Sequence, residues 1–267
     1  MKSLALLSFA GLLIALGAAV WFFLYSPSGL QQRSVFPAPA TPNPAIAARV
    51  AEAEDVQIGE GIPAYFLPGK PGGPGLLYFH GNGVTIGEQI DIFETWRRAG
   101  YSVLAVEYRG YGGAPGLASE QTTYEDAHAA YRWLRQKLGA ERPILVVGWS
   151  LGGTVAAEVA DHEPVAGLVL LAAFSSMGDM ARLRFPSLPF DRLLTYRLDT
   201  LDRVRRVRVP VLVVHGTEDH VVPFTMGRRL YEAATSPKRF LPLAGADHGE
   251  VFGAEVLRAM QRLLPFS

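Results

Sequence analysis

The sequence predicts an α/β fold in which helices cover both faces of a mostly parallel central sheet. From about residue 54 onward, short apolar runs alternate with amphipathic segments, as repeated strand–helix–strand units require. Most runs are too apolar for a sheet exposed on one face, and central parallel strands have this composition. Ligands of such a sheet bind at the carboxyl ends of its strands. The expected strands are 75–81, 101–108, 143–149, 165–173, 209–216 and 238–245.

The segment between the second and third runs has the periodicity of a helix with one buried face. Thr122 and Glu125 are spaced as a capping box that would begin this helix. The residues of the buried face recur at helical spacing. They are Tyr124, Ala127, Tyr131, Leu134 and Leu138.

Length and composition limit the possible functions. A chain of 267 residues fits a single α/β domain. Its 25 basic and 25 acidic side chains balance, which argues against nucleic-acid binding. The lack of cysteine excludes disulfides, thiolate zinc sites and a cysteine nucleophile. The sequence contains no Walker loop, dinucleotide fingerprint or metalloprotease helix, so we expect neither a cofactor nor a metal.

The N-terminal residues 1–25 are predicted to form one transmembrane helix that anchors the protein. From Leu4 to Leu24 the chain carries no charge and is long enough to cross a hydrocarbon core of about 30 Å. The run ends in aromatic residues suited to a membrane interface, whereas a cleaved signal peptide, the alternative, has a shorter apolar core. Lys2 precedes the run and Arg33 follows it, so the positive-inside tendency places the globular part on the extracytoplasmic side, the periplasm in a bacterium.

Two further segments complete the expected organisation. Residues 26–53 are rich in proline and alanine and are predicted to be a semi-rigid tether. Residues 54–267 form the globular domain. Its longest interval between expected strands, about 174–206, is predicted to be a short cap.

Ser150 follows the expected strand 143–149, within GWSLGG (148–153). Gly148 and Gly152 permit a strained strand-to-helix turn because neither flank carries a β-carbon, and such a turn lifts a nucleophilic hydroxyl above the sheet. A serine that only caps the following helix is the alternative. That alternative does not explain the paired glycines.

A serine nucleophile needs a base and a carboxylate that orients the base. His248, in GADHG after the last expected strand and at the start of the last helix, is the predicted base in the order Ser, acid, His. Asp219, in the loop HGTEDHVVP, is the predicted acid; Glu218 remains an alternative, and Asp247 adjoins His248 too closely in the backbone. Packing, turn shaping or local hydrogen bonding is expected of His80, His128, His162, His215 and His220.

An oxyanion hole would complete the chemistry with two backbone N–H groups. The amide of Leu151 directly follows the nucleophile and supplies one. Asn82 in HGNG, after the strand 75–81, is predicted to supply the other, with Gly83 as second choice. Taken alone, HGNG reads as an ordinary glycine turn, so this prediction depends on the other motifs.

The motifs HGNG, EYRGYGGAPG, GWSLGG, HGTEDHVVP and GADHG, in this order, resemble the serine-hydrolase branch of the α/β-hydrolase superfamily. In particular, the chain is similar to membrane-tethered α/β-hydrolase domain proteins, whose relatives include protein depalmitoylases and lysophospholipid lipases. The resemblance covers about residues 54–265 and implies the site roles given above. Relatives often carry Asp in place of Glu107, and we interpret Glu107 and Arg109 as scaffolding. An extracytoplasmic domain departs from the cytosolic depalmitoylases.

These parts predict an esterase- or lipase-like serine hydrolase that cleaves carboxylic ester or thioester bonds through an acyl-enzyme, without cofactor or metal. The expected partners are a small or lipid-like acyl substrate and the membrane. An amide hydrolase of the aminopeptidase or acyl-peptidase type and a non-catalytic tethered binding module are the alternatives. The cap is predicted to line an acyl pocket, and a small helix with a solvated face is the alternative. The candidate lining residues are Met177, Met180, Leu183, Phe185, Leu188 and Phe190.

Overall fold

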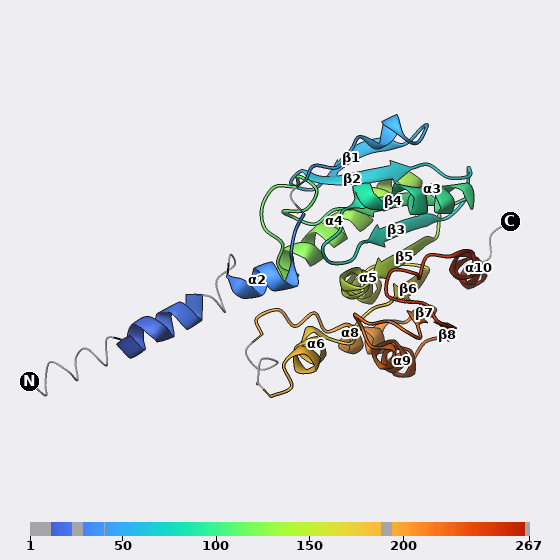
Figure 1. Ribbon diagram of the computed structural model, residues 1–267. Coiled ribbons are helices and arrows are strands. Elements are labelled where there is room, and N and C mark those ends of the chain that lie inside the picture. The colour runs from blue at the N-terminus through green and yellow to red at the C-terminus, as the bar shows by residue number, and fades with distance from the viewer. Residues whose placement is uncertain (1–11, 23–28, 40, 188–193, 265–267) are drawn as a thin grey trace, which may run out of the picture.

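The protein folds around one eight-stranded, mostly parallel sheet with helices on both faces (Figure 1). The computed structural model describes residues 12–22, 29–39, 41–187 and 194–264. The strand order is β1-β2-β4-β3-β5-β6-β7-β8; β1 and β2 pair antiparallel, as do β2 and β4, and the other neighbours are parallel. The strands are β1 (Glu54–Ile58), β2 (Ile62–Leu67), β3 (Gly75–Phe79), β4 (Ser102–Val106), β5 (Ile144–Trp149), β6 (Gly167–Leu171), β7 (Val211–Gly216) and β8 (Lys238–Leu243).

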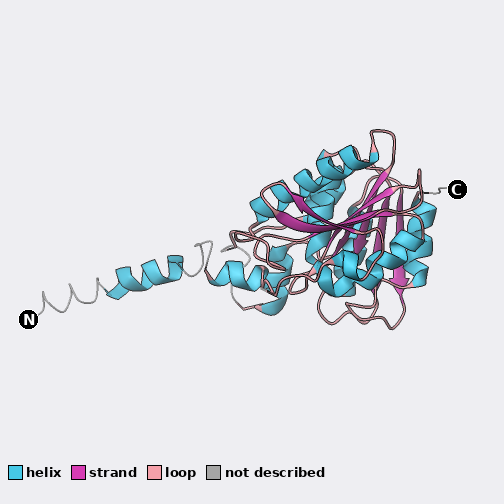
Figure 2. Cartoon of the chain, turned by 90° about the horizontal axis from the view of Figure 1, so that it is seen from above, coloured by secondary structure: helices cyan, strands magenta, loops and turns pink. Residues whose placement is uncertain are grey.

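Two apolar cores lie on opposite faces of the sheet. One packs the sheet against α4, α5, α8 and α9, and the other packs it against α3 and α10. Figure 2 shows helices on both sides of the strands. The helices are α2 (Leu30–Val35), α3 (Ile90–Arg98), α4 (Glu120–Leu138), α5 (Leu151–His162), α6 (Met177–Arg184), α8 (Thr200–Arg206), α9 (Phe224–Ala233) and α10 (Ala254–Leu263), with 3₁₀ turns η1 (Ile46–Ala48) and η2 (Ile86–Gln89).

The sequence-based prediction of the core strands is confirmed, but the first two strands were missed. β5 is buried along its whole length, which explains its unbroken apolar sequence. β1 is mostly exposed, and β2 contains Pro63, which argues against a strand when read from sequence. Both strands therefore lack the signal that revealed the others.

The start of α4 also differs from the prediction. Ser119, not Thr122, is the N-cap: its hydroxyl accepts a hydrogen bond from the amide of Thr122, and Thr122 Oγ1 accepts one from the amide of Ser119. The helix begins one turn earlier than the expected Thr122–Glu125 capping box. Thr122 can replace Glu at the third position of the box because its hydroxyl also accepts a hydrogen bond.

The segment expected to be a free tether packs largely against the domain. Phe36 and Ile46 are fully buried, one in each core. The ring of Phe36 contacts the ring of Tyr196 edge-on at 5.5 Å, and the amide of Thr195 donates to Gln31 Oε1 at 2.9 Å. Residues 29–39 therefore lie against the part of the chain expected to be the cap.

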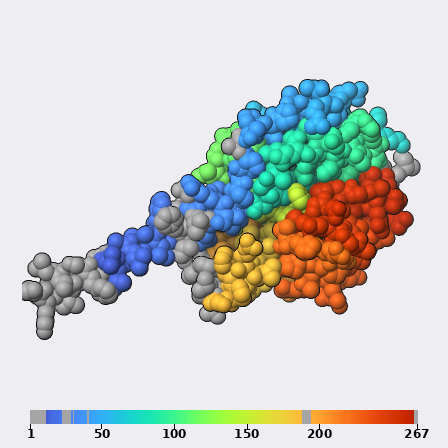
Figure 3. Space-filling model, viewed as in Figure 1, coloured from blue at the N-terminus to red at the C-terminus, as the bar shows by residue number. Residues whose placement is uncertain are grey.

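Residues 12–22 are helical and lie beyond the body of the domain (Figure 3). Their side chains are exposed, including the large apolar ones of Leu12, Ile14 and Trp21. In the described part of the chain, no helix is both long and apolar enough to cross a membrane. The rest of the predicted anchor lies outside the described residues.

Candidate active site

Ser150 occupies a strained turn between β5 and α5. Its backbone angles are φ 53° and ψ −115°, and positive φ is unfavourable for a residue with a side chain. A Cβ at Gly148 would collide with the carbonyl of Gly152, and a Cβ at Gly152 would collide with the carbonyl of Phe79. The two glycines are therefore required by the close approach of the backbone, as the sequence indicated.

The helix-capping alternative for Ser150 is wrong. Ser150 is the N-cap residue of α5, but its side chain makes no capping hydrogen bond within the described structure. Its amide donates instead to the carbonyl of Leu171 at 2.9 Å, which ties the turn to the neighbouring strand. The hydroxyl is left available at the carboxyl end of the sheet, with 7% of the residue exposed.

His248 and Asp219 are brought together as predicted. His248 Nδ1 lies 2.8 Å from Asp219 Oδ2. The indole N–H of Trp149, the residue before Ser150, donates to the carbonyl of His248 at 3.1 Å, and the two rings lie 5.5 Å apart. His248 is in the loop before α10, which begins only at Ala254, so the expectation that it opens the last helix is wrong.

Ser150 and His248 are neighbours of Trp149 but do not bond to each other. Among the described residues, no hydrogen bond joins Ser150 Oγ to the His248 ring. In unliganded sites such catalytic hydrogen bonds are often long and shorten only when substrate binds.

The side chain of Asp219 is buried and accepts hydrogen bonds through both carboxylate oxygens. Oδ1 accepts from the amides of Val221 and Val222, at 2.9 and 2.8 Å. Oδ2 faces His248 and, at 3.2 Å, Nε2 of His215. Burial acts to raise the pKa of Asp219, but the contacts with His215, His248 and Val222 outweigh it and hold the pKa below its usual range.

The alternative acids have other environments. Glu218 has an exposed side chain, and its amide donates to the carbonyl of Ala246. Asp247 Oδ1 accepts from the amides of His220 and His248, so this carboxylate shapes its own loop. Within the described chain, only Asp219 places a carboxylate oxygen against the His248 ring.

His215 is a residue whose place in the site the sequence analysis missed. It was assigned to turn shaping, yet it is fully buried, and its Nε2 donates to the carbonyl of Val222 at 2.9 Å while facing Asp219. Its four-residue spacing from Asp219 was the available signal. The loop between them folds back, so Asp219 lies between two imidazole rings.

The predicted oxyanion groups lie next to the strained turn at Ser150, which we call the Ser150 elbow. Leu151 is the first residue of α5, where backbone amides have no partner inside the helix and the helix dipole favours negative charge. Asn82 follows Gly81, and a Cβ at Gly81 would lie 2.7 Å from the Trp149 ring, so this loop packs closely on Trp149. Tyr111 donates to Asn82 Oδ1 at 3.4 Å.

A buried contact between His80 and Glu107 supports the Asn82 loop. His80 Nδ1 lies 2.8 Å from the carbonyl of Gly81, and Nε2 lies 3.0 Å from Glu107 Oε2, a contact with poor hydrogen-bond alignment. Glu107 Oε1 accepts from the amide of Ile86 at 2.8 Å and from Asn43 Nδ2 at 2.7 Å. Burial acts to raise the pKa of Glu107, but the charge of His80 and these hydrogen bonds lower it overall. Glu107 is thus a scaffold, as expected.

The residues expected to line an acyl pocket are distributed along and after α6. Met177 and Met180 are half-buried and pack against the core that contains α5, whereas Leu183 and Phe185 are exposed. The other two expected lining residues lie outside the described residues. They are Leu188 and Phe190.

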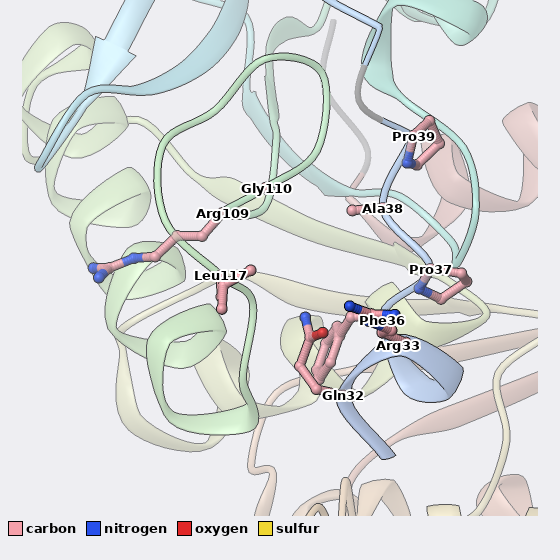
Figure 4. Close-up of a pocket in the computed structure, with 9 residues that line it drawn as sticks. All are labelled: Gln32, Arg33, Phe36, Pro37, Ala38, Pro39, Arg109, Gly110 and Leu117. Carbon is pink, nitrogen blue, oxygen red and sulfur yellow. The ribbon is translucent and has the colours of Figure 1, made fainter. Parts of the chain in front are cut away.

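A groove of about 490 Å³ lies between the N-terminal segment and the loop after β4 (Figure 4). Arg109 turns its guanidinium away from the opposite wall and donates two 2.9 Å hydrogen bonds to Asp126, which confirms its scaffolding role. The groove contains none of the predicted site residues. It is lined by Gln32, Arg33, Phe36, Pro37, Ala38, Pro39, Arg109, Gly110 and Leu117.

Comparison with known proteins identifies the family. Residues 74–206, which include β3 to β6 and the Ser150 elbow, match the family described as alpha/beta hydrolase fold. The chain belongs to the α/β-hydrolase superfamily. The fold, the relatives and the structural neighbours of this α/β-hydrolase together support an enzyme of the hydrolase class.

Three similar proteins illustrate the relationship. An uncharacterized Mycobacterium tuberculosis protein is 34% identical over 263 residues, which cover 94% of this α/β-hydrolase and 92% of the relative. The lysophosphatidylserine lipase ABHD12 of Danio rerio is 30% identical over 62% of the chain, but the match spans only 48% of that lipase. The Pyrococcus furiosus esterase Pf2001 shares the fold with a TM-score of 0.68 and 17% identity, over 85% of this chain and 97% of that chain.

Proposed function

We propose that this α/β-hydrolase is a serine hydrolase that cleaves carboxylic ester or thioester bonds of acyl substrates. The observation that carries the proposal is the hydrogen bond between His248 and buried Asp219 beside the strained Ser150 elbow. A carboxylate held ionised next to an imidazole fixes its tautomer and stabilises the imidazolium that forms during proton transfer.

The reaction proceeds in two halves. Ser150 Oγ attacks the acyl carbonyl while His248 takes the hydroxyl proton, and the amides of Leu151 and Asn82 bind the oxyanion. His248 then gives the proton to the leaving group, which departs from the acyl-enzyme. Water repeats the sequence: His248 removes a proton from water as the oxygen attacks the acyl-enzyme carbonyl. His248 then returns this proton to Ser150 Oγ as the carboxylic acid departs.

A fluorophosphonate probe tests the nucleophile. Ser150→Ala abolishes labelling and lowers ester turnover by about 10⁶-fold, to background, while the circular-dichroism spectrum stays that of the wild type. Ser34→Ala, which removes an exposed hydroxyl of α2, retains both activities. Labelling of the Ser150→Ala protein at another serine contradicts the proposal.

A lipid-like acyl chain is the proposed substrate feature. Leu183 and Phe185, at the end of α6, expose apolar side chains next to the half-buried Met177 and Met180, and together they offer an apolar surface for an acyl chain. The similarity to the lysophosphatidylserine lipase ABHD12 of Danio rerio supports the same substrate class. Turnover of acyl esters should therefore increase with the length of the acyl chain. A preference for aminoacyl amides over acyl esters favours the peptidase alternative. A lack of both turnover and fluorophosphonate labelling favours a non-catalytic binding module.

We also propose that residues 1–25 form a membrane anchor. Its support is the charge-free sequence and the exposed apolar side chains of the described helix 12–22, a surface type that marks membrane or protein contacts. The catalytic domain, residues 54–267, would then face the extracytoplasmic side. An alkaline phosphatase fused after Ser267 in a bacterial host should be active, whereas an inactive but intact fusion reverses the orientation.

A further inference from the structure

A second cluster of chemically active side chains lies at the far end of α5 from Ser150. Glu158 and His162 are four residues apart on this helix, and His128 faces them from α4. α5 has 12 residues and is therefore about 18 Å long, with Ser150 at its start and His162 at its end. The cluster is separate from the proposed catalytic site.

The cluster has the dimensions of a metal site. Glu158 Oε1 lies 3.7 Å from His128 Nε2 and 3.3 Å from His162 Nδ1, and the three atoms lie within 4.8 Å of one another. Tetrahedral Zn²⁺, with bonds of about 2.0–2.2 Å to nitrogen and oxygen, holds its ligand atoms about 3.3–3.6 Å apart. The carboxylate oxygen therefore lies close to ligand spacing from both imidazoles.

The tautomer of His128 is set by a neighbouring carboxylate. Its Nδ1 lies 2.8 Å from Glu163 Oε1, and a proton donated there leaves Nε2, which lies 3.7 Å from Glu158, as the nitrogen that would bind a metal ion in place of its own proton. A carboxylate on the outer nitrogen of an imidazole is a recurrent second layer of zinc sites because it fixes ring orientation and raises ligand basicity. The two oxygens of Glu158 are likewise divided: Oε2 binds Arg203, and Oε1 faces the imidazoles.

The charge balance favours a cation at this place. Arg203 pairs with Glu158, and Arg206 pairs with Asp161. Glu163 has no arginine or lysine at ion-pair distance in the described structure, and its ion-pair partner there is His128. Arg203 also lies 3.9 Å from Glu120, and Arg206 also pairs with Asp202, so the carboxylates around the cluster outnumber its arginines. A cation in the cluster, either a proton on an imidazole or a metal ion, offsets this excess.

His162 must adjust for a metal to bind. Its Nδ1 lies 3.0 Å from the carbonyl of Glu158, one helical turn earlier, and this bond has to be released. The side chain is 53% exposed, so its ring can rotate without disturbing the core. The backbone carbonyl of Glu158 does not have to move.

We propose that His128, Glu158 and His162 form a binding site for Zn²⁺, with water as the fourth ligand. Two imidazoles and one carboxylate form a donor set that suits this borderline ion. The bound ion joins α4 to the C-terminal end of α5 and stabilises the folded protein by mass action. The site takes no part in the serine chemistry.

Metal binding is measured directly on the full chain in detergent after treatment with a chelator. Zn²⁺ titrated in a calorimeter should bind with one equivalent per chain and raise the Tm, and Co²⁺ in its place should give the absorption bands of a tetrahedral site. His128→Asn and His162→Asn should each abolish these signals. Glu163→Gln should weaken binding by about 10–100-fold, as expected of an outer carboxylate.

The controls separate the site from other histidines and from the proposed function. His220→Asn removes an exposed histidine that pairs with Asp247, and it should bind Zn²⁺ like the wild type. The circular-dichroism spectrum of every variant shows whether the protein is folded, and the binding result is independent of labelling and of ester turnover. Two results overturn the proposal: lack of Zn²⁺ binding by the wild type, or Zn²⁺ binding by His128→Asn and His162→Asn that equals that of the wild type. Either result leaves a proton-bridged ion-pair network in place of the metal site.

Discussion

The indole N–H of Trp149 donates to the carbonyl of His248 at 3.1 Å, across 99 residues of sequence. Trp149 ends β5 directly before Ser150, and its ring also packs against Gly81 in the predicted oxyanion loop. One side chain thus contacts the loops of the predicted base and of the predicted oxyanion hole. We infer that Trp149 positions both with respect to the nucleophile.

Trp149→Phe keeps an aromatic ring and removes the hydrogen bond to His248. Loss of one such bond costs about 0.5–1.5 kcal/mol, so kcat/KM for a short ester should fall by about 2- to 12-fold with the fold retained. Steady-state kinetics and the rate of fluorophosphonate labelling measure the effect. Trp133→Phe on α4, whose indole packs on Phe66, is the matched control; equal kinetics of both variants would remove Trp149 from the positioning role.

Asp219→Asn should change stability in a pH-dependent manner. The pKa of Asp219 is depressed in the folded protein, so its ionised contacts stabilise the fold above the ordinary aspartate pKa of about 3.9. As the pH falls from there toward the folded pKa, this contribution is lost. The difference in free energy of unfolding between wild type and variant should therefore be largest near neutral pH and shrink below about pH 4.

Urea unfolding followed by circular dichroism at neutral and acidic pH gives this difference. Glu218→Gln is the control, because it neutralises the adjacent exposed carboxylate. Its stability should stay close to that of the wild type at each pH. A constant difference for Asp219→Asn across the whole range would show that the carboxylate contributes through shape and not through charge.

The parts of the site that sequence reasoning reached are those that follow parallel strands of the sheet. Asp219 and His248 come after β7 and β8, and the carboxyl ends of parallel strands share one edge of the sheet. The contact of His215 with Asp219 depends on how the loop 217–222 folds back, which the four-residue spacing of the two residues does not determine by itself. Local patterns therefore located Asp219 and His248 but not the second histidine, His215, that contacts Asp219.

Long-range polar contacts were the least predictable. Asn43 and Glu107 are 64 residues apart, and Asn43 stands in a proline-rich stretch that has the composition of a linker. Proline stiffens such a stretch but does not determine whether it is solvated or packed. Burial of Phe36 and Ile46 settles the question, and only the folded structure shows it.

Asn43→Ala removes two hydrogen bonds, from Asn43 Nδ2 to Glu107 and from the amide of Gly87 to Asn43 Oδ1. A buried carboxylate oxygen and a backbone amide lose a partner, which costs about 1–3 kcal/mol of unfolding free energy. Thermal and urea unfolding measure the loss. Thr41→Ala, an exposed change two residues away, should have no effect; an unaltered Asn43→Ala protein would mean that water replaces the amide.

The final prediction concerns where the domain can be cut. A fragment starting at Gly29 keeps Phe36 and Asn43, whereas a fragment starting at Ala45 keeps the predicted triad but loses both. Removal of a buried phenylalanine alone costs about 3–5 kcal/mol. The shorter fragment should therefore unfold at lower urea concentration and, because the Glu107–His80 pair beneath the Asn82 loop loses Asn43, turn over short esters more slowly.

The two fragments are compared at equal concentrations of active site, counted with the covalent probe. On short water-soluble esters the Gly29 fragment should match the full chain in liposomes, which separates packing of the N-terminal segment from membrane attachment. On bilayer-embedded lysophospholipid the full chain should be faster than the Gly29 fragment, because the proposed anchor confines the enzyme to the surface that holds the substrate. Equal stability of the two fragments would show that residues 29–44 contribute nothing to the fold, against the burial of Phe36.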